Sequence, residues 1–369
     1  MGFFIVVFVI YNLLLFYIGW NGWKWIQTIW GNKRSTKYIY WGVLIFFAYS
    51  FMLGRWLEAF QIITWVGALW LGIFYFSLFL LPIVNLLVFL SRFTCFSKRN
   101  VMKWSGLATG IAICCLLVFG IFNAYSPVVR TYTVNIPKEV EGKQSFNIVM
   151  ASDMHFGVLS GANHAKKLVK EINSLHPDLV LFPGDIIDDD VKPYLDKGIP
   201  QILKQINAPV YASFGNHDRD QSADLVKVFT NSGMNVLDDQ TVELDNGITL
   251  IGRKDRGYQD VVRAKLVDLM KQAEVTKPVI LLEHQPYDLD IAENKGVDLM
   301  VSGHTHRGQI APMNMITKKI YENDWGYLKR GQLQSIVSSG YGFWGTPIQI
   351  GSRAEIVKIK VTFKGRNNM

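Results

Sequence analysis

The amino-acid sequence has few cysteines, and all of them lie in its first third. Its 369 residues include Cys95, Cys114 and Cys115, and residues 127–369 contain none. A disulfide framework and a thiolate metal site are therefore excluded from residues 127–369. This cysteine usage is compatible with an oxidising compartment but does not by itself identify one.

Acidic residues are nearly missing from residues 1–126, where Glu58 stands against nine lysines and arginines. Residues 127–369 carry 29 basic and 29 acidic side chains, so the net charge of +8 belongs to the first part alone. The balanced second part gives no support for a nucleic-acid surface, and we expect no nucleic-acid partner. The change in composition divides the chain into a domain of residues 1–126 and a domain of residues 127–369.

Long apolar runs without internal charge fill residues 1–126. A helix needs about 20 residues to cross a bilayer, and the runs predict four spans: Phe3–Gly19, Tyr38–Gly54, Thr64–Leu90 and Ser105–Tyr125. The lack of charge within them argues against an ion or proton path. Asn12, Asn85 and Asn123 are expected to form hydrogen bonds between helices. No positive charge precedes the first run and no small-residue cleavage site follows it, so we do not expect a cleaved signal peptide.

The connecting loops predict the orientation of the spans. The first loop contains Lys24, Lys33, Arg34 and Lys37, and the third contains Arg92, Lys98, Arg99 and Lys103, all without an acidic residue. In the second loop, Arg55 and Glu58 cancel. Because positively charged loops stay in the cytoplasm, both termini should lie outside it. The chain is therefore expected to be a multi-pass protein of the cell membrane, in contact with membrane lipids, with residues 127–369 outside the cytoplasm.

Residues 127–369 alternate apolar runs with helical patterns, as an α/β fold does. Strands are predicted in "FNIVMASD", "DLVLFPGD", "APVYASFGNHD", "KPVILLEH", "VDLMVSGH", "SIVSSG" and "AEIVKIKVTF", with a hairpin in "VELDNGITLIG". Helices are predicted in "HAKKLVKEINSL" and "QSADLVKVFTNSG". Polar residues directly follow the apolar strands. Strand ends of layered α/β folds gather into one site, so these polar residues are expected to meet.

The polar residues at the strand ends make one set of candidate ligands. They are Asp153, His155, Asp185, Asn216, His217, Asp218, His284, His304 and His306. The set uses five of the seven histidines, and its nitrogen and oxygen donors suit Mn, Fe or Zn. It is too large for one tetrahedral ion, whereas two ions that share a carboxylate would use all of it. Two ions about 3.5–4 Å apart are a known arrangement for cleaving phosphoesters.

Five short blocks of this sequence, in this order, resemble those of the calcineurin-like metallophosphoesterases. The blocks are "SDMHFG", "PGDIIDDD", "FGNHD", "LLEHQP" and "GHTHRGQ". The resemblance covers about residues 146–363, and the tail "SSGYGFWGTPIQIGSRAEIVKI" is similar to that of the bacterial YkuE-like branch. It implies a two-sheet sandwich flanked by helices, in αββα layers. Together with the four predicted spans, which lie outside the resemblance, the expected fold is α/β, with a four-helix transmembrane region before the sandwich.

The resemblance also implies a role for each residue of the blocks. One divalent ion would be held by Asp153, His155, Asp185 and His306, and a second by Asp185, Asn216, His284 and His304, with Asp185 bridging. His217 would be the general acid, oriented by Asp218. The implied reaction is hydrolysis of a phosphomonoester, phosphodiester or pyrophosphate bond by a hydroxide that bridges the ions. The implied partner is a phosphorylated small molecule or lipid.

Several residues leave two interpretations open. Arg307 stands where relatives of this branch commonly have glycine, and it either binds a second phosphate or forms a surface salt bridge. Asp188, Asp189 and Asp190 begin a loop or cap a helix, with Asp188 as a candidate neighbour of the ligands. His164 and His176 are interpreted as solvent-exposed. The aromatic residues after the last block form either an apolar lip for a lipid-linked or nucleobase-bearing substrate or ordinary loop packing: Trp325, Tyr327, Tyr341, Phe343 and Trp344.

The leading hypothesis is a membrane-anchored phosphoesterase with two metal ions, acting on an envelope or lipid-linked compound outside the cytoplasm. A second is a pyrophosphatase of a nucleotide-sugar lipid, which conflicts with the predicted orientation because that reaction normally needs a cytoplasmic nucleotide. A third is a metal-binding membrane scaffold without enzymatic activity. It is disfavoured because every ligand of the pattern is present.

Overall fold

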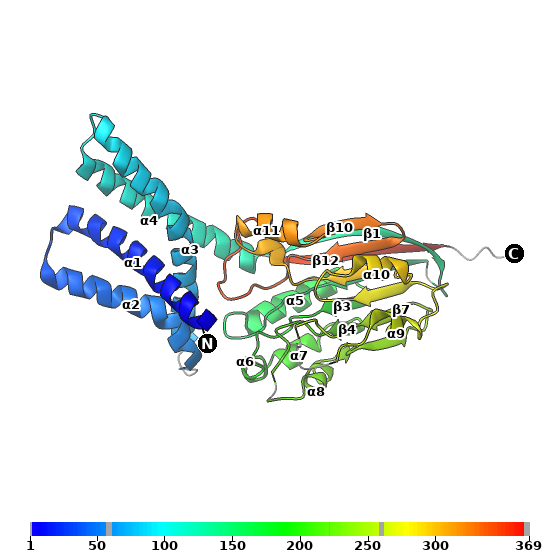
Figure 1. Cartoon of the computed structure of the whole chain (residues 1–369). Helices are drawn as coiled ribbons and strands as arrows, with labels where there is room; N and C mark the ends of the chain where they lie inside the picture. The colour runs from blue at the N-terminus through cyan, green and yellow to red at the C-terminus, as the bar shows by residue number, and fades with distance from the viewer. Residues whose placement is uncertain (1, 57–60, 143, 221, 258–261, 365–369) are drawn as a thin grey trace. The chain divides into compact units, whose positions relative to one another are not determined.

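The computed structural model describes residues 2–56, 61–142, 144–220, 222–257 and 262–364 (Figure 1). The chain separates into two compact units. We call Met1–Ile121 with Gly345–Pro347 the helical unit, and Phe122–Trp344 with Ile348–Met369 the sandwich unit. The last turn of the fourth apolar helix thus belongs to the sandwich unit. Glu58, which entered the orientation argument, lies outside the described residues.

The predicted membrane spans are confirmed as four helices that are long and apolar enough to cross a bilayer. They are α1 (Gly2–Trp30), α2 (Arg34–Trp56), α3 (Gln61–Leu90) and α4 (Lys98–Tyr125), with a short 3₁₀ helix η1 (Ser91–Phe93) after α3. The helices exceed the predicted runs at most ends, and α1 continues through Trp20, Trp23, Trp25 and Trp30. Such aromatic residues are typical of the membrane–water interface.

Hydrogen bonds join the helices inside the helical unit, as predicted for two of the three asparagines. Asn12 Oδ1 accepts from the Tyr49 hydroxyl at 2.8 Å, and Asn85 Nδ2 donates to the Tyr17 hydroxyl at 2.9 Å. Asn123 differs, because its side chain donates to the backbone of Gln349 within the sandwich unit. A mainly apolar hollow of about 660 Å³ lies between the helices, lined by residues that include Trp25 and Trp70.

Two six-stranded sheets form the sandwich unit. The order is β1-β12-β2-β3-β4-β5 in the first sheet and β10-β11-β9-β8-β7-β6 in the second. The strands of the first are β1 (Val128–Glu139), β12 (Glu355–Lys364), β2 (Ser145–Met150), β3 (Leu179–Pro183), β4 (Val210–Ser213) and β5 (Met234–Val236). The strands of the second are β10 (Gly326–Arg330), β11 (Leu333–Val337), β9 (Leu299–Ser302), β8 (Val279–Leu282), β7 (Thr249–Gly252) and β6 (Gln240–Glu243).

The direction of the strands places their carboxyl ends together. Strands β2 to β5 run parallel in the first sheet, and β7, β8, β9 and β11 run parallel in the second. Strand β12 is antiparallel to β2, while β6 and β10 are antiparallel edge strands. The hairpin predicted in "VELDNGITLIG" is the β6–β7 pair. The predicted α/β sandwich is thereby confirmed.

The central strands are apolar throughout because both of their faces are buried. In β3, Leu179 and Leu181 point between the two sheets, whereas Val180 and Phe182 point to the outer face. In β8, Ile280 and Leu282 share the inner core with them. Successive side chains alternate between the faces of a strand, and parallel strands covered on both faces read as continuous apolar runs. The inter-sheet core thus holds the two sheets face to face.

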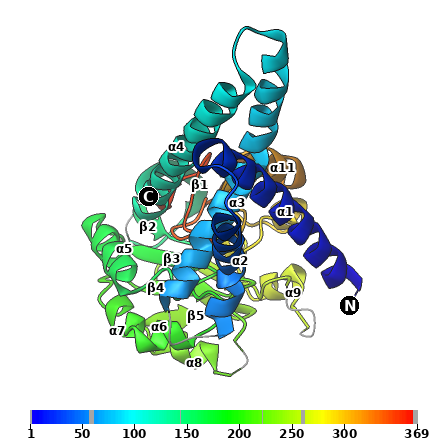
Figure 2. The same cartoon turned by 90° about the vertical axis from the view of Figure 1, so that its left-hand side faces the viewer.

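Helices cover the outer faces of both sheets (Figures 1 and 2). The first sheet is covered by α5 (Ala162–Ser174), α6 (Lys192–Asp196), α7 (Ile199–Leu203) and α8 (Leu225–Thr230), and the second by α9 (Leu266–Met270) and α10 (Leu289–Asn294). The 3₁₀ helix η2 (His306–Gly308) and α11 (Met313–Ile320) follow β9. Helix α5 buries Leu168 and Ile172, four residues apart, as its apolar period predicts.

Candidate metal centre

The structure gathers the predicted ligand side chains at the carboxyl ends of five strands. Asp153 and His155 follow β2, Asp185 follows β3, and Asn216 follows β4 in the first sheet. From the second sheet come His284 after β8, and His304 and His306 after β9. Five of these residues have a positive φ: Asp153 (52°), His155 (44°), Asp185 (54°), His304 (70°) and His306 (45°). Such strained backbone clusters at functional sites, so the turns hold these side chains at a conformational cost.

A first group of donor atoms surrounds the Nε2 atom of His155. The Nε2 of His306 lies 3.1 Å from it, and Oδ2 of Asp185 lies 3.6 Å from it. Oδ1 of Asp153 is 3.5 Å from Nε2 of His306. All four side chains are buried. These are the residues that the resemblance assigned to one ion.

A second group shares Asp185 with the first. Its Oδ2 atom is 3.1 Å from Nε2 of His284, whose Nδ1 donates to the backbone oxygen of Pro183 at 2.9 Å. Nδ1 of His304 lies 2.8 Å from Oδ1 of Asn216. The backbone amide of His304 donates to Oδ1 of Asp153 at 2.8 Å, which ties the second sheet to the first. The Pro183 carbonyl fixes the tautomer of His284 and leaves Nε2 facing Asp185.

The donor atoms fit divalent cations. Two ligands of one ion with bonds of about 2.1 Å lie roughly 3.0–3.4 Å apart, close to the separations within both groups. Asp153 Oδ2 and His306 Nδ1 are buried and have no hydrogen-bond partner among the described residues. Acids and imidazoles of this region also form groups whose ligand atoms all lie within 4.8 Å of one another. Since buried polar atoms are rarely left unpaired, the centre is suited to cations.

In the absence of a cation, burial and charge shift the pKa values of the candidate ligands in different directions. Burial raises the pKa of Asp153, and the charge of Asp185 raises it further. Burial lowers the pKa of His155, but Asp188 and Asp185 outweigh that effect and raise it to about 9. Burial, with the charge of His284, lowers the pKa of His304 to about 4, so its imidazole is neutral near pH 7. Neutral imidazoles and ionised carboxylates are the ligand forms that a bound cation stabilises.

His217 lies beside the first group, and its ring is paired with Asp189. Its Nδ1 is 3.0 Å from Oδ1 of Asp189, and its ring centroid is 4.9 Å from that of His155. Burial raises the pKa of Asp189, but the hydrogen bond and charge of His217, with Arg219, lower it overall. Asp189 is therefore ionised near neutral pH and holds the ring so that Nε2 is left for a proton.

Asp218, for which the resemblance implies the orientation of His217, contacts the backbone of two turns, and its orienting role stays a prediction. The Asp218 carboxylate is fully buried and accepts hydrogen bonds from the backbone amides of Ile186, Ile187 and Gly215 at 2.9–3.0 Å. It thereby joins the turn after β3 to the turn after β4. The sequence "GNHD" placed the nearest acid in the chain beside His217, but the "DDD" segment reaches the ring through space.

Some residues beside the candidate ligands are predicted from the sequence, and others are not. Asp188 Oδ1 lies 3.4 Å from Nδ1 of His155, as expected for a neighbour of the ligands. Asp190 accepts from the backbone amide of Lys192 at the start of α6. Glycines allow the turns to approach: a Cβ on Gly303 would collide with the Asp153 carboxylate, and one on Gly215 with Asp185. In the sequence, these glycines are evident as the residues directly before His304 and Asn216, in the "GH" and "GN" pairs of the motifs.

The side chain of Arg307 is stacked on an aromatic ring. Its guanidinium lies 3.9 Å over the Trp325 ring, which Arg130 approaches at 4.8 Å. The Trp325 indole is also 3.3 Å from both oxygens of Glu355. Arg307 makes no salt bridge among the described residues, so the surface salt bridge is not found there. Phosphate binding by Arg307 stays a prediction.

The aromatic residues after the last block do not form one exposed lip. Tyr341 and Phe343 are buried, and Tyr327 belongs to strand β10 rather than to a loop. Trp344, which is 57% exposed, lies 6.0 Å from the His217 ring. Packing thus accounts for the buried aromatic residues, whereas Trp344 is exposed beside the His217 ring.

The interpretation of His164 as solvent-exposed is wrong. Its side chain is buried, stacks on Tyr341 at 4.3 Å, and bonds through Nδ1 to the Ser160 hydroxyl at 2.9 Å. Helix α5 turns this position toward the first sheet along with Leu168. His176 is exposed, as expected.

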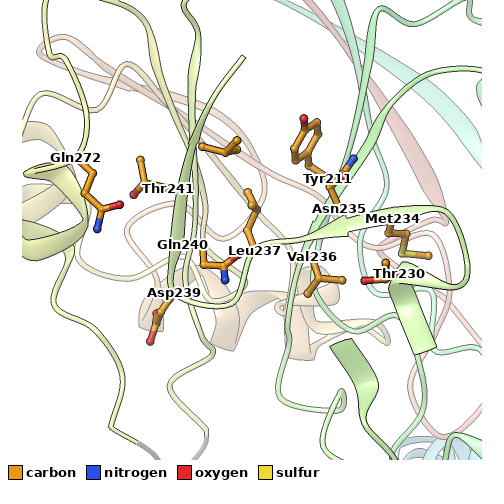
Figure 3. A pocket seen from close by; sticks show the side chains of 11 residues that line it. Tyr211, Thr230, Met234, Asn235, Val236, Leu237, Asp239, Gln240, Thr241 and Gln272 are labelled. Carbon is orange, nitrogen blue, oxygen red and sulfur yellow. The ribbon is translucent and has the colours of Figure 1, made fainter. Parts of the chain in front are cut away.

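The sandwich unit has a hollow of its own, of about 500 Å³, between β5 and β6 at the edges of the two sheets (Figure 3). Its lining carries amide and hydroxyl groups, including Asn235, Gln240 and Gln272, and one acid, Asp239. The described residues that line it include no histidine, so they offer none of the imidazole donors found at the metal centre.

Comparisons with known proteins agree with this centre. The family model described as calcineurin-like phosphoesterase matches residues 146–308, which contain all of the gathered ligands. A metallophosphoesterase of Aquifex aeolicus is 32% identical over 65% of this chain and 93% of its own length. A Danio rerio protein described as a transmembrane protein with a metallophosphoesterase domain is 27% identical over 79% of this chain and 73% of its own.

Other relatives are matched over less of their length. The chain spans 61% of a metallophosphoesterase of Helicobacter pylori strain J99, at 32% identity over 60% of this chain. Among solved structures, a Thermus thermophilus protein has a TM-score of 0.38 at 13% identity, over 53% of this chain and 89% of that one.

Proposed function

Since the chain belongs to the calcineurin-like phosphoesterase family, we propose that it is a membrane-anchored hydrolase of phosphoester or pyrophosphate bonds that works with two divalent ions. The observation that carries the proposal is that the two groups of candidate ligands meet at Asp185, which approaches His155 of one group and His284 of the other. One ion would be held by Asp153, His155, Asp185 and His306, and the other by Asp185, Asn216, His284 and His304. The nitrogen and oxygen donors suit Mn, Fe or Zn.

When bound, such ions polarise the phosphate and make a water molecule nucleophilic near neutral pH. The protein side chains would supply the ligand atoms, and His217 would supply the proton for the leaving oxygen. A water that has already lost one proton to solvent would attack through its oxygen, which joins phosphorus while the ester P–O bond breaks. The Nε2 proton of His217 goes to the departing oxygen, because Asp189 occupies Nδ1 at 3.0 Å. A positioned acid of this kind contributes about 10²–10⁴-fold to the rate.

Arg307 is our candidate for contact with a second anionic group of the substrate. It follows His306 directly and is stacked on Trp325, with no carboxylate paired to it among the described residues. A stacked guanidinium keeps its charge and its donors. Arg307→Gln should raise KM for a pyrophosphate or diester substrate more than for a simple monoester. Equal changes in both would remove Arg307 from substrate binding.

We place the sandwich unit outside the cytoplasm, on the basis of the positive loops. A reporter that is active only outside the cytoplasm, fused after Met369, should be active. A reporter that works only inside should stay silent in the same fusion. The opposite pair of results would reverse the orientation and favour the nucleotide-sugar-lipid pyrophosphatase, whose substrate is cytoplasmic.

The test of function is metal-stimulated hydrolysis by the purified full-length protein, with Asp185→Asn as the variant. We would supply Mn²⁺ and measure a generic monoester, a generic diester and lipid phosphates, together with bound metal. Asp185→Asn preserves the shape of the side chain but removes the shared charge, so both metal content and hydrolysis should fall. The matched control is Asp196→Asn, because Asp196 is exposed at the end of α6.

The outcomes separate the candidate functions. Hydrolysis that Asp185→Asn abolishes and Asp196→Asn retains would establish the phosphoesterase. Hydrolysis that persists in Asp185→Asn would overturn the proposed centre. Two bound metal ions without activity on any of these substrates would favour the metal-binding scaffold.

A further inference from the structure

The last turn of α4 is built into the sandwich unit. Asn123 Nδ2 donates to the backbone oxygen of Gln349 at 3.1 Å, and the Ala354 amide donates to the backbone oxygen of Asn123 at 3.2 Å. The Tyr125 hydroxyl donates to the backbone oxygen of Leu159 at 2.9 Å. Helix α4 is apolar enough to span a bilayer up to Tyr125. The part of the sandwich unit that contacts Tyr125 is therefore expected near the level where the chain leaves the hydrocarbon.

One loop connects this exit point with the metal centre. At its start, the amides of Tyr341 and Gly342 donate to the backbone oxygens of Ser152 and Asp153 at 2.8 Å. The next residue, Phe343, lies 5.2 Å from the Tyr125 ring. Trp344 then stands 57% exposed, with its ring 6.0 Å from that of His217. The end of α4 and the proton donor are thus separated by Phe343 and Trp344.

The position of Trp344 is fixed from the other side by the last metal block. The Gln309 side chain donates to the Trp344 backbone oxygen and accepts from the Trp344 amide, both at 2.9 Å. An exposed tryptophan held by two hydrogen bonds to its backbone is a fixed feature of the rim. Tryptophan is enriched at membrane interfaces because its ring is apolar and its N–H is polar.

Helix α11 adds an apolar surface that nothing in the described part of the sandwich unit covers. Met313, Ile316 and Ile320 lie three and four residues apart on one side and are 36%, 48% and 56% exposed. The helix buries none of its residues and carries Lys318 and Lys319 in its last turn. It is nevertheless held in place: the Thr317 hydroxyl donates to Asp324 at 2.9 Å. The same Asp324 accepts from the Thr305 hydroxyl, between the two ligands of β9, through its backbone oxygen at 2.7 Å.

We propose that the metal centre opens onto the bilayer surface, with α11 and Trp344 in the headgroup region, and that the substrate is a phosphate ester in the headgroup of a lipid in that leaflet. This inference rests on the proposed function. An amphipathic helix places its apolar side at the boundary between headgroups and acyl chains. The two lysines suit anionic headgroups. The substrate phosphate then reaches His217 without leaving the plane of the membrane.

The position of α11 can be measured without any activity. In full-length protein whose three cysteines are replaced by serine, Ile316→Cys would carry a nitroxide label, and the protein would be placed in phosphatidylcholine–phosphatidic acid nanodiscs. The label should be more accessible to oxygen than to a water-soluble nickel chelate. The control is Ile291→Cys on α10, which is 42% exposed and should show the reverse. Equal, water-like accessibility at both positions would overturn the proposal.

A second experiment uses hydrolysis. Rates would be compared for long-chain phosphatidic acid and phosphatidylglycerol in nanodiscs and for their short-chain, water-soluble forms. Ile316→Asp with Ile320→Asp should lower the ratio of bilayer rate to soluble rate about tenfold, whereas Ile291→Asp should not. An unchanged ratio would refute the docking surface. Loss of the Asp185→Asn effect on the soluble esters would instead refute the proposed function, so the two failures are distinguishable.

Discussion

Two acidic residues, Asp189 and Asp218, are candidates to contact the ring of His217. In the structure they make different contacts. Asp189 contacts the ring at 3.0 Å, and Asp218 binds three backbone amides of the turns after β3 and β4. In the proposed mechanism, the first contact positions the proton donor. The second contact holds two turns together. The consequences of losing each acid should therefore differ.

Asp189→Asn should lower kcat about tenfold or more, because a poorly oriented His217 donates its proton less well. Bound metal and thermal stability should change little. Asp218→Asn should instead destabilise the folded state by about 1–3 kcal/mol, since a buried charge-assisted acceptor is weakened. The measurements are kcat, metal content and unfolding temperature for both variants. If Asp218→Asn lowered kcat without any loss of stability, the assignment of the two acids would have to be exchanged.

His164 predicts a pH dependence of stability. Burial, together with the charge of Lys167, lowers its pKa to about 4, whereas the unfolded imidazole titrates near 6.5. The unfolded state therefore takes up the proton first. The stability from this residue is complete above pH 6.5 and declines as the pH falls toward 4. His164→Gln should flatten the fall in unfolding temperature over this range. The exposed His176→Gln is the matched control, and identical slopes in the two variants would contradict a buried neutral His164.

At the scale of elements, the turns that follow the strands hold the candidate ligands, and some positions in these turns have no room for a side chain. A Cβ added at Gly303, which follows β9, would collide with the Asp153 carboxylate. Gly303→Ala should therefore displace a ligand and lower metal affinity by about 10–100-fold. Bound metal after dialysis measures the effect. Gly42→Ala in α2 is the control, because a Cβ there meets no atom within 4 Å. Retention of both ions by Gly303→Ala would show that the turn can relax.

The elements differ in how well the sequence predicts them. Strands β3, β8 and β9 are evident because both faces are buried, which leaves an uninterrupted apolar run before each ligand. Strand β10, which contains Tyr327, is not evident from the sequence because its burial is partial and glycines stand at both of its ends. Helix α11 escapes the same reasoning because it buries nothing. The local sequence does not indicate contacts between residues that are distant in the chain, such as Asp189 and His217.

At the scale of the whole molecule, metal binding should be visible as stability. A ligand that binds only the folded state at 100 times its Kd adds about 2.7 kcal/mol. Mn²⁺ added to chelator-treated protein should raise the unfolding temperature of the sandwich unit, and Asp185→Asn should reduce this rise. Asp196→Asn should keep it. A rise of the same size in Asp185→Asn would mean that the ions bind elsewhere.

The arrangement of the first sheet has a consequence for biosynthesis. Strand β12 lies between β1 and β2 and pairs with both, yet β1 emerges from the ribosome directly after α4. Roughly 215 residues separate the end of β1 from the start of β12. At 5–20 residues per second, β1 waits about 10–40 s for its neighbour while α4 already tethers it to the membrane. The nascent chain therefore carries the unpaired strand β1 until β12 has been translated. A ribosome stalled before Glu355 would leave β2, which Asp153 follows, as an open edge of the sheet.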